Sequence, residues 1–412
     1  MVRPAAQAPL EPALPVGALT PAGLARRLES GGGRLRHLYL HIPFCERICP
    51  YCDFSTAVGA GTEPGRFLDD LVSEERLLRQ AGISGRLARS EGTLYLGGGT
   101  PSWFSPDRLR TLLDWVGGLA GREWVEATCE VNPEHTGSER LEVLRSGGIT
   151  RLSLGVQSLD EGVLRRLGRV HTAGQVRAGT ALARRLGFDL SLDVIFAVPG
   201  QTTESCLADL EGVLALEPDH LSLYGLTWEE GTPFTRWRDS GRLRAWEPEA
   251  EAEFYQRAVD RLRAGGWERY EVSNFARPGK EARHNAAYWS GADYLGLGPS
   301  AHSLLTGVRT ANAFRLHDWE GRVRAGEVPW AEVEELGERE QARERVLLGL
   351  RTAAGLSLDE VPASFREEVR RAAETVVDQG LARWHQEEAN LRLVLTDRGM
   401  LLADEVAVRV AP

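Results

Sequence analysis

The stretch HIPFCERICPYCDFS, residues 41–55, places three cysteines within eight positions at the end of a strand-like run. These cysteines are Cys45, Cys49 and Cys52. The other two, Cys129 and Cys206, stand alone in apolar segments, which is not the spacing of a secreted disulfide framework. The sequence therefore predicts a reducing compartment, the cytoplasm, and a metal or iron–sulfur site at the clustered thiolates.

The run before the cysteines is the first of six strand-like segments, each of which ends in a polar or glycine-rich cluster. The segments are HLYLHIPFC, TLYLGGGTPS, VEATCEVNPE, RLSLGVQS, LSLDVIFAVPGQT and HLSLYGLTWEEGTPF. Amphipathic, helix-like stretches alternate with them, at residues 66–80, 106–118, 173–186 and 203–215. This alternation predicts a parallel α/β sheet, and six units are fewer than the eight that close a barrel. We therefore expect an open partial (β/α)6 TIM-like barrel whose polar clusters face one cavity at the carboxyl ends of the strands.

The strand–helix alternation lapses after about residue 236, and this change suggests how the chain is divided. We expect a mobile N-terminal lead-in over 1–34, the partial barrel over 35–235, an extension over 236–305 and a smaller domain over 306–412. The last part reads as mainly helical and ends in a short strand, a turn and a helix, so we expect a winged-helix-like domain.

The amino-acid composition argues against several classes of binding partner. The formal net charge of −10 offers no basic field for a phosphate backbone, so we expect no nucleic-acid partner. Lys280 is the only lysine, which excludes a GK[ST] phosphate-binding loop. No apolar run approaches the length of a membrane span, so we expect none.

Three clustered thiolates leave two interpretations open. A structural zinc site needs four ligands, so His41 or Asp53 would have to complete it. A cubane iron–sulfur cluster held by three cysteines leaves one iron free for another ligand. The CxxxCxxC spacing after a strand resembles the cluster motif of the radical S-adenosylmethionine (SAM) superfamily, in which SAM chelates that iron. The resemblance implies a [4Fe-4S] cluster on Cys45, Cys49 and Cys52, with SAM beside it.

Further segments resemble the SAM-binding positions of the same superfamily. In GGGTPS, backbone without a Cβ would lie against the amino group of SAM. Carboxylates at strand ends would accept hydrogen bonds from the ribose hydroxyls of SAM, and an arginine would pair with its methionyl carboxylate. The positions implied are Tyr39, Tyr51, Gly98, Gly99, Thr100, Glu130, Gln157, Arg169, Asp193 and Gly225.

Within the superfamily, the chain from about residue 35 onward resembles oxygen-independent coproporphyrinogen III oxidase and its relatives. The oxidase carries a fourth cysteine two residues after the third, where this chain has Phe54. The segment HNAAYW, His284 to Trp289, is similar to the HNxxYW motif of HemW-type haem chaperones. An imidazole can take an axial position on haem iron while Tyr288 and Trp289 present aromatic faces to the porphyrin. The resemblance thus implies His284 as a haem ligand.

Two hypotheses follow from these resemblances. The first is a haem chaperone that binds haem, a [4Fe-4S] cluster and SAM, and passes haem to an acceptor protein, through which it would associate peripherally with a membrane. The second is a radical SAM enzyme acting on coproporphyrinogen III or another substrate. Phe54 and His284 favour the chaperone, so we expect no oxidase activity. An RNA-modifying radical SAM enzyme is disfavoured, because the acidic chain lacks a basic RNA-binding appendage.

Other haem ligands stay open at this point. They are His171, His302, Cys129 and Cys206. The two cysteines fit buried packing positions better than ligand positions, because free cysteine behaves as a small apolar residue.

Overall fold

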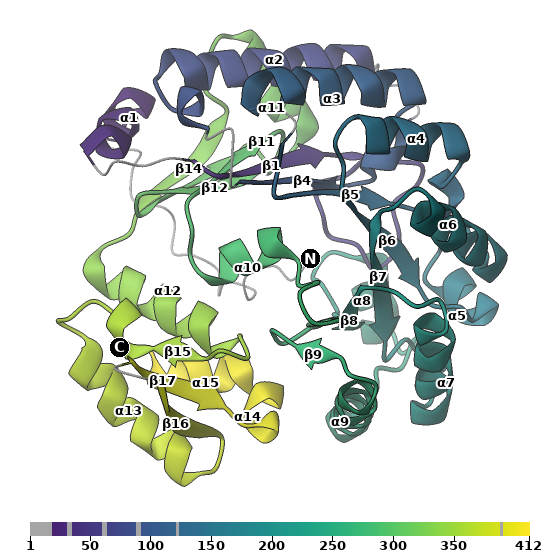
Figure 1. Cartoon of the computed structure of the whole chain (residues 1–412), viewed down its shortest axis with the longest axis vertical. Coiled ribbons are helices and arrows are strands. Elements are labelled where there is room, and N and C mark those ends of the chain that lie inside the picture. The colour runs from purple at the N-terminus through teal and green to yellow at the C-terminus, as the bar shows by residue number, and fades with distance from the viewer. Residues whose placement is uncertain (1–18, 31–34, 60–63, 88–91, 121–122, 388–389) are drawn as a thin grey trace.

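The computed structural model describes residues 19–30, 35–59, 64–87, 92–120, 123–387 and 390–412. Six parallel strands form its centre and neighbour one another in the order in which they occur along the chain. They are β1 (His37–Ile42), β4 (Thr93–Gly98), β5 (Glu126–Val131), β6 (Arg151–Gln157), β7 (Asp189–Phe196) and β8 (His220–Gly225). The sheet curves and helices cover its outer face, which confirms the predicted open partial barrel (Figure 1).

Helices follow the central strands. They are α2 (Pro64–Gln80), α3 (Pro106–Ala120), α4 (Ser138–Ser146), α5 (Glu161–Arg166), α6 (Ala173–Arg185), α7 (Thr203–Leu214), α8 (Pro233–Asp239) and α9 (Pro248–Ala264). Four of them, α5, α6, α7 and α8, begin after a residue whose side chain caps the first turn. Thr172 and Thr202 each close a capping box at the start of α6 and α7. The predicted helical stretches correspond to α2, α3, α6 and α7. The pattern did not reveal α4 and α5, because nine and six residues are too few to display a helical period.

The central strands present different side chains to their two faces. In β6, Leu152 and Leu154 belong to the apolar core, whereas Ser153 between them lines a cavity inside the curve of the sheet. This separation follows from the two-residue period of a strand. The register pairs Glu130 with Ser153 and Ser153 with Ser191, so polar side chains form a row across the inner face.

The sheet continues past both edges of the six parallel strands, to twelve strands in all. On one side β11 (Tyr294–Leu297) runs parallel to β1, followed by the antiparallel strands β12 (His302–Leu305), β13 (Val308–Asn312) and β14 (Trp330–Glu335). On the other side lie β10 (Asn274–Ala276) and β9 (Glu268–Arg269). The last strand of the central sheet, β14, therefore ends at Glu335, beyond the predicted domain boundary at residue 306.

Helix α1 (Pro21–Ser30) departs from the predicted mobile lead-in over residues 1–34. Leu24 and Leu28 are fully buried in the main core, because a spacing of four residues places both on one face of the helix. The remainder of that lead-in, residues 1–18 and 31–34, lies outside the described residues.

The C-terminal unit has a core of its own, which runs from Ala342 to Val410. Its elements are α12 (Glu338–Leu350), β15 (Leu356–Ser357), α13 (Arg366–Asp378), β16 (Ala382–Glu387), β17 (Asn390–Leu395), α14 (Asp397–Leu401) and α15 (Ala403–Val410). An antiparallel sheet in the order β15–β17–β16 packs with the helices, which agrees with a winged-helix-like domain.

The C-terminal unit lies across the opening of the curved sheet (Figure 1). Backbone hydrogen bonding joins the two parts, since the Val272 N–H donates to the Arg351 carbonyl at 3.0 Å. Arg269 also pairs with Asp397 at 2.8 Å. Among the helices of the described ranges, none is both long enough and apolar enough to cross a membrane.

Candidate functional site

One cavity of about 810 Å³ lies at the carboxyl ends of the central strands and collects most of the predicted residues. The predicted residues that line it are Cys45, Cys49, Tyr51, Cys52, Gly98, Gly99, Thr100, Glu130, Gln157, Arg169, Asp193 and Gly225. Tyr39 and His284 lie instead beside a smaller cavity of about 60 Å³, nearer the amino ends of the strands. A cavity of the larger size can hold a nucleoside-sized ligand together with further groups.

The three clustered cysteines are free thiols, and they line this same cavity. The Thr100 hydroxyl lies 3.5 Å from the Cys45 sulfur, and the Arg169 guanidinium lies 3.7 Å from the Cys49 sulfur. Burial raises the pKa of the Cys45 thiol to about 11. Three sulfurs that share one cavity, with donors directed at two of them, fit an iron–sulfur cluster bound by three ligands.

The zinc alternative needs His41 or Asp53 as a fourth ligand. Both ring nitrogens of His41 are engaged, with the Tyr39 hydroxyl at 3.1 Å from Nδ1 and the Ser55 carbonyl at 2.8 Å from Nε2. Asp53 lines the cavity beside the cysteines. Because both ring nitrogens have partners, His41 does not offer a free nitrogen to a zinc ion in this structure.

The glycine loop after β4 is packed against the end of β1. A Cβ on Gly98 would lie 2.6 Å from the His41 ring, and this residue also has a φ of 107°, which other residues rarely adopt. A Cβ on Gly99 would lie 2.6 Å from the Pro43 carbonyl. The glycines are thus required by contacts within the chain, a structural role that is compatible with the predicted approach of a ligand.

Glu130 is held by two donors at the base of the cavity. The Tyr95 hydroxyl donates to Oε1 at 2.9 Å, and the Gly98 N–H donates to Oε2 at 3.0 Å. Burial nevertheless raises the pKa of Glu130 to about 7, since removal from water disfavours the charged form.

Ser153 and Asn132, which were not predicted as site residues, hold predicted polar side chains of the cavity in place. The Ser153 hydroxyl lies 2.9 Å from Oδ2 of Asp193, whose pKa is raised by burial. The Asn132 side chain accepts a hydrogen bond from Arg169 at 2.6 Å and donates to Thr100 at 3.3 Å. Their positions were readable in the sequence, because both lie on or directly after the strands that carry the predicted residues.

The C-terminal unit also contributes to the cavity wall, through Arg351, Leu401 and Asp404. Arg351 pairs with Asp404, and its guanidinium Nη1 is buried with no hydrogen-bond partner among the described residues. No local signal in the sequence marks these residues, because they reach the cavity only when the two parts of the chain pack together.

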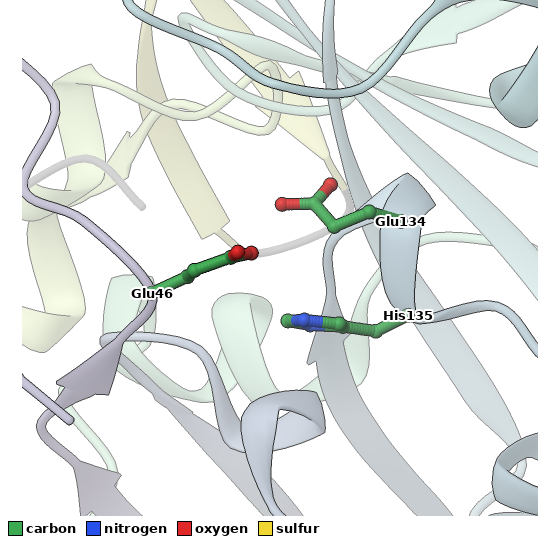
Figure 2. Close-up of side chains that lie close together, drawn as sticks. All are labelled: Glu46, Glu134 and His135. Atoms are coloured by element: carbon green, nitrogen blue, oxygen red, sulfur yellow. The ribbon is translucent and has the colours of Figure 1, made fainter. Parts of the chain in front are cut away.

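Glu46, Glu134 and His135 form a group of possible metal ligands, and the two glutamates line the cavity (Figure 2). One donor atom from each lies within 4.8 Å of the others. Glu46 follows the first cluster cysteine, whereas the other two lie in the short turn after β5, so the group brings two separate segments together.

His284, the predicted haem ligand, is enclosed in this structure. Its Nδ1 lies 2.7 Å from the Thr93 hydroxyl, its Nε2 lies 2.8 Å from the Tyr288 hydroxyl, and 1% of the residue is exposed. Burial lowers its pKa to about 3. With both nitrogens occupied and only a 60 Å³ cavity beside it, His284 is not presented to a haem in this structure.

The alternative haem ligands differ in access. His171 is buried, with Nε2 at 3.0 Å from the Val156 carbonyl, whereas His302 is exposed. Cys129 and Cys206 are buried within the apolar core, as their apolar surroundings predicted.

Comparison with known proteins places this geometry in a family. A sequence model of the radical SAM superfamily matches residues 39–211, and one of the HemN C-terminal domain matches residues 336–402. The chain is 33% identical to the heme chaperone HemW of Bacillus subtilis over 90% of this chain and 98% of that protein. It is 38% identical to heme chaperone HemW of Mycobacterium tuberculosis over 90% and 93% of the two chains.

A solved structure supports the same fold. The coproporphyrinogen III oxidase HemN from Escherichia coli, described as a radical SAM enzyme, superposes with a TM-score of 0.78 over 94% of this chain and 93% of that chain. Its 22% sequence identity limits this likeness to the fold. The family assignment rests on the identity of 33% and 38% to these two heme chaperones over 90% of the chain. This chain belongs to the HemW family of haem chaperones in the radical SAM superfamily.

Proposed function

We propose that this chain is a haem chaperone that carries haem to an acceptor protein and holds a [4Fe-4S] cluster with SAM in its large cavity. The observation that carries the proposal is the match to curated heme chaperones over nine-tenths of the chain. It is supported by the three free thiols and the polar strand ends that share one cavity.

In this proposal Cys45, Cys49 and Cys52 hold the cluster. When bound, a cluster with one open iron supplies a site for the methionyl group of SAM and an electron for its reduction. Arg169, fixed by Asn132, would pair with the methionyl carboxylate.

The remaining polar positions would bind the nucleoside. Glu130 and Asp193 would accept hydrogen bonds from the ribose hydroxyls, because each carboxylate lines the cavity and is oriented by a neighbouring hydroxyl. Tyr51 and Gln157 belong to the cavity wall and would contact the rest of SAM.

Haem is the cargo rather than a resident group, and we infer that it binds without His284. That histidine has both nitrogens hydrogen-bonded and is buried. A ligand on haem iron must offer a free nitrogen, sulfur or oxygen atom at a surface that the porphyrin can reach.

A second candidate is a radical SAM enzyme acting on coproporphyrinogen III or another substrate. The shared fold with the oxidase and the set of SAM-type side chains in the cavity favour it. Phe54 stands against it, since the oxidase has a cysteine at that position.

Anaerobic reconstitution with iron and sulfide, followed by haem and coproporphyrinogen III assays, separates the two functions. We expect saturable haem binding, seen in the Soret band, and no SAM-dependent decarboxylation. Replacing Cys45, Cys49 and Cys52 together by Ala should remove the brown chromophore while haem still binds. Robust decarboxylation without haem binding would establish the enzyme instead, and tightly bound zinc without iron or sulfide would refute the cluster.

A further inference from the structure

The helix that carries the HNxxYW motif, α10 (Arg283–Trp289), lies inside the curve of the sheet (Figure 1). Glu126, the first residue of β5, accepts hydrogen bonds from the backbone N–H groups of Arg283 at 3.1 Å and His284 at 3.0 Å. Arg151, the first residue of β6, pairs with the same carboxylate at 3.1 Å, and both side chains are buried. The motif is therefore anchored at the amino ends of the strands, which we call the barrel floor.

On this floor the His284 ring is fixed from three sides. The Thr93 and Tyr288 hydroxyls lie 2.7 Å and 2.8 Å from its two nitrogens. The third contact is with Tyr95, whose ring centroid lies 5.2 Å from that of His284. A ring held by two hydrogen bonds and full burial has little freedom to change rotamer, so it forms a rigid support for Tyr95.

Tyr95 connects this support to the large cavity. Its ring contacts that of His284 and also that of Tyr39, the latter at a centroid distance of 6.1 Å. Its hydroxyl donates to Glu130 at 2.9 Å, and Glu130 receives its second hydrogen bond from the Gly98 N–H. Tyr39 and His284, the two predicted residues outside the cavity, thus both contact the residue that orients Glu130.

We propose that the HNxxYW helix is a positioning element of the SAM pocket, in which His284 holds the Tyr95 ring so that its hydroxyl orients Glu130 toward the ligand. The inference rests on the proposed function only in placing SAM in the large cavity. It assigns the motif to SAM affinity rather than to haem iron, because a side chain oriented before binding loses less entropy when the ligand arrives.

The test uses the full chain, reconstituted anaerobically, with SAM affinity and haem affinity measured on the same samples. Tyr95→Phe removes only the hydroxyl that contacts Glu130 and should weaken SAM binding about tenfold, the effect of one lost hydrogen bond to a charged group. His284→Ala should weaken it by a similar factor, and His284→Gln, which keeps polar atoms for its neighbours, should restore part of the loss. Tyr294→Phe is the matched control: it removes the hydroxyl of a ring that packs 4.6 Å from that of Tyr288 on the helix of His284, and it should leave SAM affinity unchanged because the donors to Glu130 are Tyr95 and Gly98.

Four readouts separate positioning from a general structural role. The electron paramagnetic resonance signal of the reduced cluster should need about tenfold more SAM to change in Tyr95→Phe, whereas the Soret band, the haem Kd and the melting temperature stay as in the wild type. Normal SAM affinity in Tyr95→Phe overturns the proposal even if the His284 variants fail to fold. An altered Soret band with unchanged SAM affinity in His284→Ala overturns it in favour of haem ligation. Failure of the wild type to bind haem would refute the chaperone function but leave the SAM measurements decisive.

Discussion

At Glu130, burial and hydrogen bonding act in opposite directions on one carboxylate. Burial raises its pKa to about 7, while the donors on Tyr95 and Gly98 favour the ionised form. The side chain is therefore close to its titration point at neutral pH and can respond to a ligand that donates hydrogen bonds. Burial also raises the pKa of Asp193, whose Oδ2 accepts a hydrogen bond from the Ser153 hydroxyl at 2.9 Å.

Replacing Glu130 by Gln should weaken SAM binding about tenfold or more and leave the iron content unchanged. The two carboxylate oxygens of Glu130 accept hydrogen bonds from Tyr95 and Gly98, but the glutamine amide has one oxygen and one NH₂ group. One of the two donors therefore loses its acceptor. Asp193→Asn should act in the same direction. Equilibrium dialysis with SAM and iron analysis on the same samples measure both effects. Normal SAM affinity in both variants would show that these carboxylates do not bind SAM.

Between elements, Glu74 on α2 joins three segments that are distant in sequence. Its fully buried carboxylate accepts hydrogen bonds from the Gly298 N–H at 2.8 Å, the Asn312 amide at 2.6 Å and the Trp319 indole at 3.1 Å. These donors follow β11, end β13 and lie on α11 (Leu316–Arg324). One side chain thus attaches α2 to the outer strands and to α11.

Replacing Glu74 by Ala should lower the free energy of unfolding by roughly 3 kcal/mol or more, because three buried donors lose their acceptor and each costs about 1 kcal/mol or more. Urea denaturation followed by circular dichroism measures the change. Glu253→Ala is the control, since its side chain is 60% exposed and its loss should cost less than about 0.5 kcal/mol. Equal stability of the two variants would show that Glu74 does not stabilise the attachment of α2 to the outer strands and α11.

Across the whole molecule, buried acids and buried histidines respond to pH in opposite senses. Burial raises the pKa of Glu74 and of Glu271 from 4.5 to about 7. Their contribution to stability is complete below pH 4.5 and is lost as the pH rises through 7. Burial lowers the pKa of His41 to about 4 and of His284 to about 3, so their contribution is present above pH 6.5 and lost as the pH falls toward those values.

The free energy of unfolding of the chain without ligands should therefore respond to the two sets in opposite senses below about pH 6.5. It should fall between about pH 6.5 and 7.5, where the acids with a pKa of about 7, Glu74, Glu130 and Glu271, still titrate and the histidines do not. Urea titrations at pH 5.5, 6.5 and 7.5 test this profile. A free energy that rises from pH 6.5 to 7.5 would contradict the assigned pKa directions.

The sequence by itself determined the six parallel strands, the cysteine loop and the predicted side chains that share the large cavity. These features are local: strand alternation fixes which side chains face inward, and parallel strands bring their carboxyl ends to one side of the sheet. Only the tertiary structure decided that His284 is enclosed on the barrel floor, that α1 is packed into the core and that Arg351 reaches the cavity. Each depends on contacts between residues far apart in the chain, such as Thr93 with His284, and no local pattern encodes such pairs because they form only when the whole core packs.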